Sequence, residues 1–146
     1  MIRFIAAIDN KNGIADDNNI PWQGKLPSDV AYYRAKVMFN PYIIGYATYL
    51  KHSEPLPATP TLVATKSEEA LRPGFTRIAD ARTFLKEAIG EVWVGGGAGL
   101  YASVLDLADE LYLTRIKGDF HCTKFFPAFE NDFQLVLAAP EKVEND

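Results

Sequence analysis

The chain has 146 residues, of which 48% are hydrophobic and 23% charged, and its formal net charge is −4. These values are typical of a single globular domain, here residues 1–146, and they exclude a disordered chain. The acidic balance argues against nucleic acid as the main partner, since no basic stripe is available to neutralise phosphates. Cys122 is the only cysteine, which excludes an intramolecular disulfide and a cysteine-based zinc site, and we expect no metal.

The chain begins with an apolar segment, residues 1–9, that is far too short for a signal peptide or a membrane span. Its length and composition instead predict a buried strand over Ile2–Ile8. We therefore expect no contact with a membrane, and a reducing cytoplasm is the expected compartment.

Apolar runs of strand length alternate with helical patterns along the chain, which is typical of an α/β domain. The predicted strands are Ile2–Ile8, Tyr42–Ile44, Thr61–Thr65, Phe75–Ile78, Glu91–Val94, Glu110–Lys117 and Phe133–Ala138. Several of them are continuous Val, Ile and Leu runs rather than alternating patterns. Such runs indicate strands that are buried on both faces of a sheet.

Helical patterns lie between the predicted strands. The predicted helices are one that begins at Pro27 and three more, at Ala47–Lys51, Ala81–Ile89 and Ala98–Leu107. Proline suits a first helical position, Asp80 can cap the third helix, and Gly90 can end it. The polar stretch Asn10–Lys25 has no period, so we expect a long mobile loop of the kind that often carries function.

A single acid stands out at the start of the first predicted helix. Asp29 falls in its first turn, with Tyr33 one turn later on the same face. An acid in a first turn often does no more than complement the helix dipole. Trp22 and Leu26, however, would place an apolar wall beside this carboxyl, and desolvation raises the pKa of an acid, as at many catalytic sites. Both roles remain open for Asp29.

Three predicted strands end in residues that suit a phosphate-bearing ligand. The run Gly95–Gly99 follows one strand, Gly45 and Thr48 follow another, and Thr65 and Lys66 close a third. Each feature alone can be a helix cap, a packing glycine or an ordinary surface lysine. The glycine run matches neither a complete dinucleotide fingerprint nor a phosphate-binding loop of the Walker type. Together the three strand ends favour a nucleotide cofactor.

These segments together resemble the chromosomal type of dihydrofolate reductase. The similarity covers nearly the whole chain, in matching order and spacing. The segments that carry it are Ile5-Ala6-Ala7, Ile20-Pro21-Trp22, Leu26-Pro27 with Asp29, Gly45 with Thr48, Leu56-Pro57, Gly96-Gly97 with Tyr101, Leu111-Tyr112-Leu113-Thr114 and Phe125-Phe126-Pro127. Each piece alone is weak, but the combination is highly specific.

The resemblance implies a three-layer α/β/α sandwich with a mostly parallel central sheet and flanking helices. We expect about seven strands, because the family's last hairpin strand would lie beyond Asp146. The implied activity is the NADPH-dependent reduction of 7,8-dihydrofolate to tetrahydrofolate, with NADH as an alternative hydride donor.

The resemblance also implies site residues, at the positions that match the family's motifs. Those implied for catalysis are Asp29, Trp22, Thr114 and Tyr101. Those implied for substrate binding are Ile5, Val30, Tyr33, Arg34 and Leu56. Those implied for cofactor binding are Ala7, Ile14, Ile20, Gly45, Thr48, Thr65, Lys66, Gly96, Gly97, Ala98, Gly99 and Leu100, with a cis peptide between Gly96 and Gly97.

Within this set, Asp29 would bond the amino-pyrimidine edge of the pterin and promote protonation of its N5 atom. Thr114 would bond that carboxylate or the pterin amino group, although a buried hydroxyl more often bonds to nearby backbone. Trp22 would order a bridging water, and the loop Asn10–Lys25 would close over the nicotinamide. One acid is enough, because hydride transfer becomes easy once the receiving imine is protonated.

Several positions depart from the family pattern. Thr59 stands where the family has the arginine that binds the folate α-carboxylate, and the candidates to compensate are Arg34, Lys51 and His52. Tyr46 and Gly99 replace basic residues near the cofactor, which leaves Lys66 as the main cation for its 2′-phosphate. Gly95 replaces a bulky aliphatic residue that borders the pterin, and Thr123 replaces an aspartate that often helps to hold the loop closed.

Two other functions stay open at this point. The missing arginine favours a nicotinamide-dependent reductase of a tail-less pterin or a riboflavin-pathway pyrimidine. A non-catalytic pterin- or nucleotide-binding protein is the third reading, although such a protein has no need of a costly buried acid. We expect a monomer, with a dimer through the open sheet edge at Phe133–Ala138 as the alternative.

Overall fold

The computed structural model of the chain describes residues 1–17 and 19–139. The strands are β1 (Ile2–Ile8), β2 (Gly13–Ala15), β3 (Tyr42–Gly45), β4 (Thr61–Ala64), β5 (Phe75–Ile78), β6 (Val92–Val94), β7 (Glu110–Arg115) and β8 (Lys124–Phe125). The helices are α1 (Pro27–Val37), α2 (Tyr46–Leu50), α3 (Ala81–Glu87) and α4 (Ala98–Val104), and a short 3-10 helix, Leu105–Leu107, extends α4.

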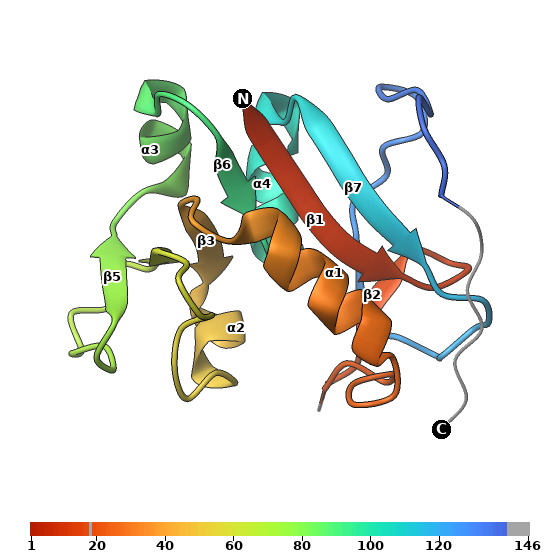
Figure 1. Cartoon of the computed structure of the whole chain (residues 1–146), viewed down its shortest axis with the longest axis horizontal. Helices are drawn as coiled ribbons and strands as arrows, with labels where there is room; N and C mark the ends of the chain where they lie inside the picture. The colour runs from red at the N-terminus through yellow and green to blue at the C-terminus, as the bar shows by residue number, and fades with distance from the viewer. Residues whose placement is uncertain (18, 140–146) are drawn as a thin grey trace.

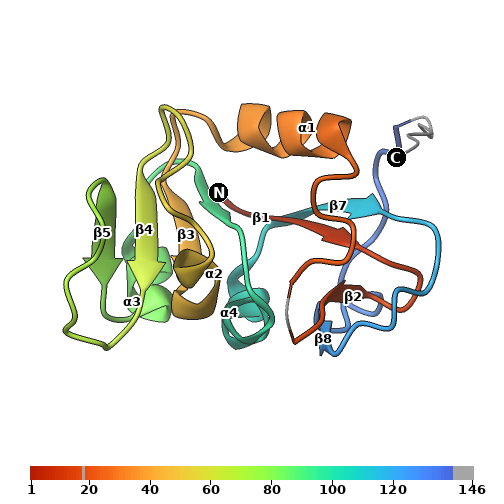
Figure 2. The same ribbon diagram turned by 90° about the horizontal axis from the view of Figure 1, so that it is seen from below.

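The strands form a six-stranded central sheet in the order β5-β4-β3-β6-β1-β7 and a separate two-stranded sheet, β2-β8 (Figure 1). Every neighbouring pair in the central sheet is parallel. Helix α1 lies on one face of this sheet, and α3 and α4 lie on the other (Figure 2). The structure therefore confirms the three-layer α/β/α sandwich.

Alternate residues of the central strands enter two separate apolar clusters, one on each face. In β1, Phe4 belongs to the cluster under α3 and α4, and Ile5 belongs to the cluster that also contains Val37 of α1. In β6, Val94 belongs to the cluster under α3 and α4, and Trp93 belongs to the cluster with Val37. Both faces of a parallel sheet must be covered, which explains the continuous apolar runs of these strands.

The helices begin and end largely as local rules dictate. Pro27 occupies the first turn of α1 together with Asp29, and its last turn is basic, as the helix dipole favours. Asp80 caps α3 by accepting hydrogen bonds from the backbone N–H groups of Arg82 and Thr83. Helix α3 nevertheless ends at Glu87, two residues earlier than predicted.

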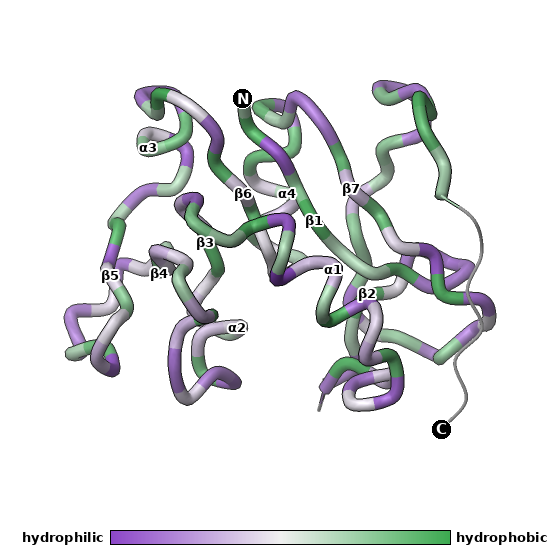
Figure 3. The backbone as a smooth tube through the Cα atoms, in the orientation of Figure 1, coloured by the Kyte–Doolittle hydropathy of each residue, from purple (hydrophilic) through white to green (hydrophobic). Residues whose placement is uncertain are grey.

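Two sequence predictions about the sheet were wrong. Phe133–Ala138 forms no strand, and the central sheet of the described chain has six strands rather than seven. This segment is hydrophobic (Figure 3), but the side chains of Leu135, Val136 and Leu137 are at least 80% exposed, and without a partner strand no ladder holds them. The predicted loop Asn10–Lys25 contains β2, which pairs with β8 and is too short to show a period in sequence.

Candidate functional site

The parallel order of the central sheet brings the three candidate strand ends to one edge. Strands β4, β3 and β6 are neighbours, so Thr65, Gly45 and Gly95 all follow or close strands at the same side. The N–H of Gly45 donates to the carbonyl of Gly96 at 2.7 Å, and the N–H of Gly95 donates to the carbonyl of Ile43 at 2.9 Å. In open α/β sheets, ligands bind outside this edge.

The glycine turn has the geometry that close approach of a ligand requires. The Gly96–Gly97 peptide is cis, which confirms that expectation. A side chain at Gly97 would lie 3.3 Å from the Thr48 hydroxyl, and one at Gly99 would meet nothing within 4 Å. Gly97 precedes α4, whose first residues Ala98–Leu100 were also predicted to bind the cofactor. The structure thus brings Gly45, Thr48 and the Gly96–Gly97 turn together.

The end of β4 supplies polar groups beside this turn. The Thr65 hydroxyl accepts a hydrogen bond from the N–H of Ser67 at 3.1 Å, and Lys66 is exposed. The Tyr46 hydroxyl donates to Glu69 at 3.4 Å, so an acid lies beside the position where the family has a basic residue. Bare glycine backbone, two hydroxyls and one cation fit a phosphate-bearing dinucleotide, with a weak site for an additional phosphate.

The predicted acid, Asp29, stands in the first turn of α1. Helix α1 runs opposite to β1, and its first turn, with Asp29, is near the end of β1 in both views (Figures 1 and 2). Asp29 is half-buried. Thr114 of β7 is paired with Ala7 of β1. The buried Tyr101 donates its hydroxyl to the carbonyl of Ile5 at 2.6 Å. The structure therefore gathers Thr114, Ala7, Ile5 and Tyr101 around β1.

The loop before α1 is only partly enclosed. Trp22 is buried and packs edge-to-face against Phe120, with 5.3 Å between ring centroids. Ile14 is half-buried in β2 against the core, whereas the side chain of Ile20 is 42% exposed. No described contact brings Ile20 to the glycine turn, so its predicted role in cofactor binding stays a prediction.

Asp9 anchors this loop, a role that the sequence analysis missed. Its buried carboxylate accepts hydrogen bonds from the N–H groups of Lys11 and Gly13 at 2.8 Å and of Phe120 at 3.1 Å. Burial alone raises the pKa of Asp9, but these bonds and one from the Cys122 thiol outweigh it, so the pKa is lowered. The sequence did contain a signal for this role, because Asp9 directly follows the buried strand Ile2–Ile8 and stands four residues before Gly13.

Thr123, at the position of the family's aspartate, joins the 118–123 segment to the loop. Its hydroxyl donates to the carboxylate of Asp17 at 2.9 Å, and its N–H donates to the carbonyl of Ala15 at 3.0 Å. The acid of this pair, Asp17, belongs to the loop. The two segments remain joined.

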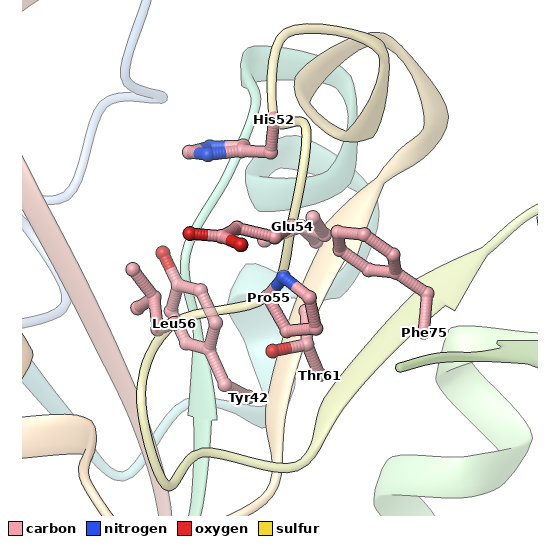
Figure 4. A pocket seen from close by; sticks show the side chains of 8 residues that line it. Tyr42, His52, Glu54, Pro55, Leu56, Thr61 and Phe75 are labelled. Atoms are coloured by element: carbon pink, nitrogen blue, oxygen red, sulfur yellow. The ribbon is translucent and has the colours of Figure 1, made fainter. Parts of the chain in front are cut away.

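Three of the predicted substrate residues line a cavity of about 270 Å³. Tyr33 and Arg34 come from α1, and Leu56 comes from the segment after α2, with Lys51 and His52 completing the rim. Val30 is half-buried in α1 outside this lining. Figure 4 shows the adjoining small pocket, where Leu56 and His52 lie beside Tyr42 and Glu54.

The structure narrows the candidates that could replace the missing arginine. Thr59 is buried, and its hydroxyl donates to the carbonyl of Pro57 at 2.9 Å, so it does not line the cavity. Burial, and then the charges of Arg34 and Arg72, lower the pKa of His52, which is therefore neutral near pH 7. Arg34 and Lys51 remain as the cationic groups of the cavity wall, which also contains the acid Glu54.

The described helices include none that is both long and apolar enough to cross a membrane.

Known proteins share this arrangement and much of the sequence. A family model described as dihydrofolate reductase matches residues 1–146. The chain is 34% identical over 139 residues to the dihydrofolate reductase of Bacillus subtilis (strain 168), which covers 93% of this chain and 82% of that protein. It is 33% identical over 132 residues to dihydrofolate reductase type 3 of Salmonella typhimurium, over 88% of this chain and 80% of that protein.

A solved structure agrees with these matches. The dihydrofolate reductase from Enterococcus faecalis complexed with NADP(H) and RAB-propyl superimposes with a TM-score of 0.78 at 27% identity, over 88% of this chain and 77% of that chain. The family match, the relatives and the shared fold confirm the resemblance found in the sequence, and the chain belongs to the dihydrofolate reductase family.

Proposed function

We propose that the protein catalyses the NADPH-dependent reduction of 7,8-dihydrofolate to 5,6,7,8-tetrahydrofolate. The observation that carries this proposal is that the first turn of α1, which contains the half-buried Asp29, lies near the end of β1, and that β6, the neighbour of β1, leads into the glycine turn. A proton source and a dinucleotide site then share one edge of the sheet. The chain's membership of the family supports the same substrate and cofactor.

Asp29 is proposed to bind the amino-pyrimidine edge of the pterin and to promote protonation of N5. Thr114, fixed in β7 opposite Ala7, would bond the carboxylate or the pterin amino group, and Trp22 would hold a bridging water. The Tyr101 phenol fixes the carbonyl of Ile5 at the wall of the ring site. Burial raises the pKa of Tyr101, so its hydroxyl stays protonated and continues to donate.

The cofactor side of the site would bind NADPH through residues of four segments. The Gly96–Gly97 turn carries no side chains, so its backbone can come close to the cofactor. Thr48 and Thr65 offer hydroxyls to phosphate oxygens. Lys66 would face the 2′-phosphate. NADPH, when bound, supplies the hydride. Positioning of the two ring systems by the protein accounts for much of the remaining acceleration.

The cavity between α1 and Leu56 would take the benzoyl and glutamate part of the substrate. Tyr33 and Leu56 offer apolar surface, and the two cations Arg34 and Lys51, against the single acid Glu54, offer positive charge to the carboxylates. This arrangement supports dihydrofolate over the tail-less pterin that the missing arginine had suggested, and the comparisons favour neither that reductase nor a non-catalytic binding protein.

We further propose that the protein acts as a cytoplasmic monomer. Residues of a single chain supply both halves of the described site, so no second copy is required. A single cysteine suits a reducing compartment.

The deciding experiment is Asp29→Asn, assayed by NADPH consumption with dihydrofolate. We expect kcat/KM to fall by roughly 10²–10⁴-fold at pH 7, the range for loss of a positioned acid. The remaining rate should rise as the pH falls, because solvent must then supply the proton. Unchanged NADPH binding and melting temperature would show that the variant is folded. Wild-type protein that fails to consume NADPH with dihydrofolate, or an active Asp29→Asn at pH 7, would refute the proposal.

A further inference from the structure

The space left by the missing side chain at Gly95 is filled by Tyr42 from the neighbouring strand. Tyr42 of β3 is paired with Trp93 of β6, and Gly95, two residues after Trp93 and just past the end of β6, lies on the same face. A Cβ at Gly95 would lie 2.1 Å from the Tyr42 hydroxyl oxygen and 2.2 Å from its nearest ring carbons. Only glycine at position 95 allows the phenol to extend to this edge of the sheet.

The hydroxyl of Tyr42 is available to a ligand. The residue is 7% exposed, yet nothing in the described part of the chain forms a hydrogen bond with its oxygen. No side-chain oxygen among the described residues is both fully enclosed and unbonded, so this oxygen keeps some exposure. Tyr42 lines the small pocket of about 10 Å³ that shares Leu56 and His52 with the substrate cavity. A buried tyrosine hydroxyl ordinarily has a partner. Burial, and then Tyr33, raise the pKa of Tyr42, so the group remains a donor as well as an acceptor.

The position of the hydroxyl indicates which part of the substrate it would meet. In Figure 4 the phenol extends toward the side of the pocket where Leu56 and Glu54 lie. Tyr42 shares an apolar cluster with Ile5, Tyr33 and Leu56, the residues proposed to contact the substrate. Strand β3 is separated from β1 by β6, so the phenol lies on the tail side of the ring site rather than on the side of β7 and Thr114.

We propose that the Tyr42 hydroxyl is a substrate-binding group that forms a hydrogen bond with the secondary amine linking the pterin ring to the benzoyl group. The inference rests on the proposed function and deepens it. It assigns a polar contact to a position where the family has an aliphatic wall. Gly95 and Tyr42 thus act as a pair, since the glycine creates the space and the tyrosine supplies the contact.

The test is Tyr42→Phe, which removes one oxygen and keeps the ring. We expect KM for dihydrofolate to rise about 3- to 10-fold with little change in kcat, as for loss of one neutral hydrogen bond. A 6-methyl dihydropterin lacks the linking amine, so its KM should not change, and neither should KM for NADPH or the melting temperature. An unchanged KM for dihydrofolate, or an equal rise with both substrates, would overturn the proposal. Its failure is distinct from failure of the proposed function, which wild-type turnover of dihydrofolate decides.

A second variant separates the hydroxyl from general packing. Gly95→Ala places a methyl group within the present position of the phenol and must displace it. In that background Tyr42→Phe should raise KM for dihydrofolate no further, because the contact is already lost. A full additional 3- to 10-fold rise would contradict the geometry argued for the pair.

Discussion

Single residues show how this chain departs from its family without losing the fold. Gly95 lacks a side chain, and Tyr42 fills the space from the next strand. Thr59 lacks the positive charge of the family's arginine, and its hydroxyl instead bonds the turn that contains it. In both cases the new residue fits its surroundings, because the Tyr42 phenol occupies the space at Gly95 and the Pro57 carbonyl accepts the Thr59 hydroxyl.

Ala58 adopts a backbone conformation that strains a residue with a side chain. The N–H of Thr59 donates to the carbonyl of Leu56 at 3.3 Å, which closes a turn with Pro57 second and Ala58 third. Ala58 has φ +54°, a backbone region in which this kind of turn favours glycine. A Cβ in this backbone region costs about 1–2 kcal/mol.

We therefore expect Ala58→Gly to stabilise the protein by about 0.5–1 kcal/mol, since the relieved strain exceeds the added freedom of the unfolded chain. Urea denaturation measures the change. The matched control is Ala35→Gly, on the exposed surface of α1, where the same substitution should destabilise by about 1 kcal/mol. Losses of similar size at both positions would show that the turn is not strained.

At the scale of elements, the short β2-β8 sheet matters more than its length suggests. It joins the loop before α1 to a segment about 110 residues later in the chain, and Asp9 is its hydrogen-bonding centre. The Cys122 thiol donates a further hydrogen bond to Asp9. Burial, and then the charge of Asp9, raise the pKa of this thiol to about 11, so it stays protonated and continues to donate. The Trp22 position depends on this anchor, since Trp22 packs on Phe120, whose N–H bonds Asp9.

Asp9→Asn should destabilise the protein by about 1–3 kcal/mol at neutral pH, because an amide leaves buried N–H donors without adequate acceptors. The folded pKa of Asp9 is lowered, so its contribution is fully present above the unfolded value near 3.9 and is lost as the pH falls through the folded pKa. The difference between wild type and variant should therefore shrink below about pH 4. Unfolding curves at several pH values, with exposed Asp132→Asn as the control, test this. A pH-independent difference would contradict the role of the charge.

The same elements show what the sequence could and could not reveal. The Pro27 start, the Asp80 cap and the glycine turn were predictable, because each follows from residues adjacent in the chain. Tyr42 could not be found in this way, because its partner Gly95 comes from a distant segment that only the sheet order brings close. Asp9 could be found only in part, because its partners Lys11 and Gly13 are local but Phe120 is distant. Phe133–Ala138 was mispredicted for the complementary reason, since strand composition forms a strand only when a partner is beside it.

The whole molecule places its two proposed ligands on different parts of one sheet. Strands β4, β3 and β6 end at the proposed cofactor site, whereas β1 and β7 lie beneath the proposed pterin site, and β6 joins the two. Because the folded sheet forms the site and the unfolded chain does not, a bound cofactor stabilises the entire domain. Melting temperature therefore reports cofactor contacts without any need for turnover.

We expect NADPH at a hundred times its Kd to add about 2.7 kcal/mol of stability, or roughly 5–10 °C for a domain of this size. Lys66 is the main cation proposed for the 2′-phosphate, and because it is exposed, Lys66→Ala should weaken NADPH binding only about fivefold. NADH has no such phosphate, so its thermal shift should not change. Lys124→Ala, an exposed lysine on β8 outside the cofactor site, should alter neither shift. If Lys66→Ala reduced the thermal shifts of NADPH and NADH equally, Lys66 would not bind the 2′-phosphate. The cation that distinguishes the two cofactors would then have to lie elsewhere on this edge of the sheet.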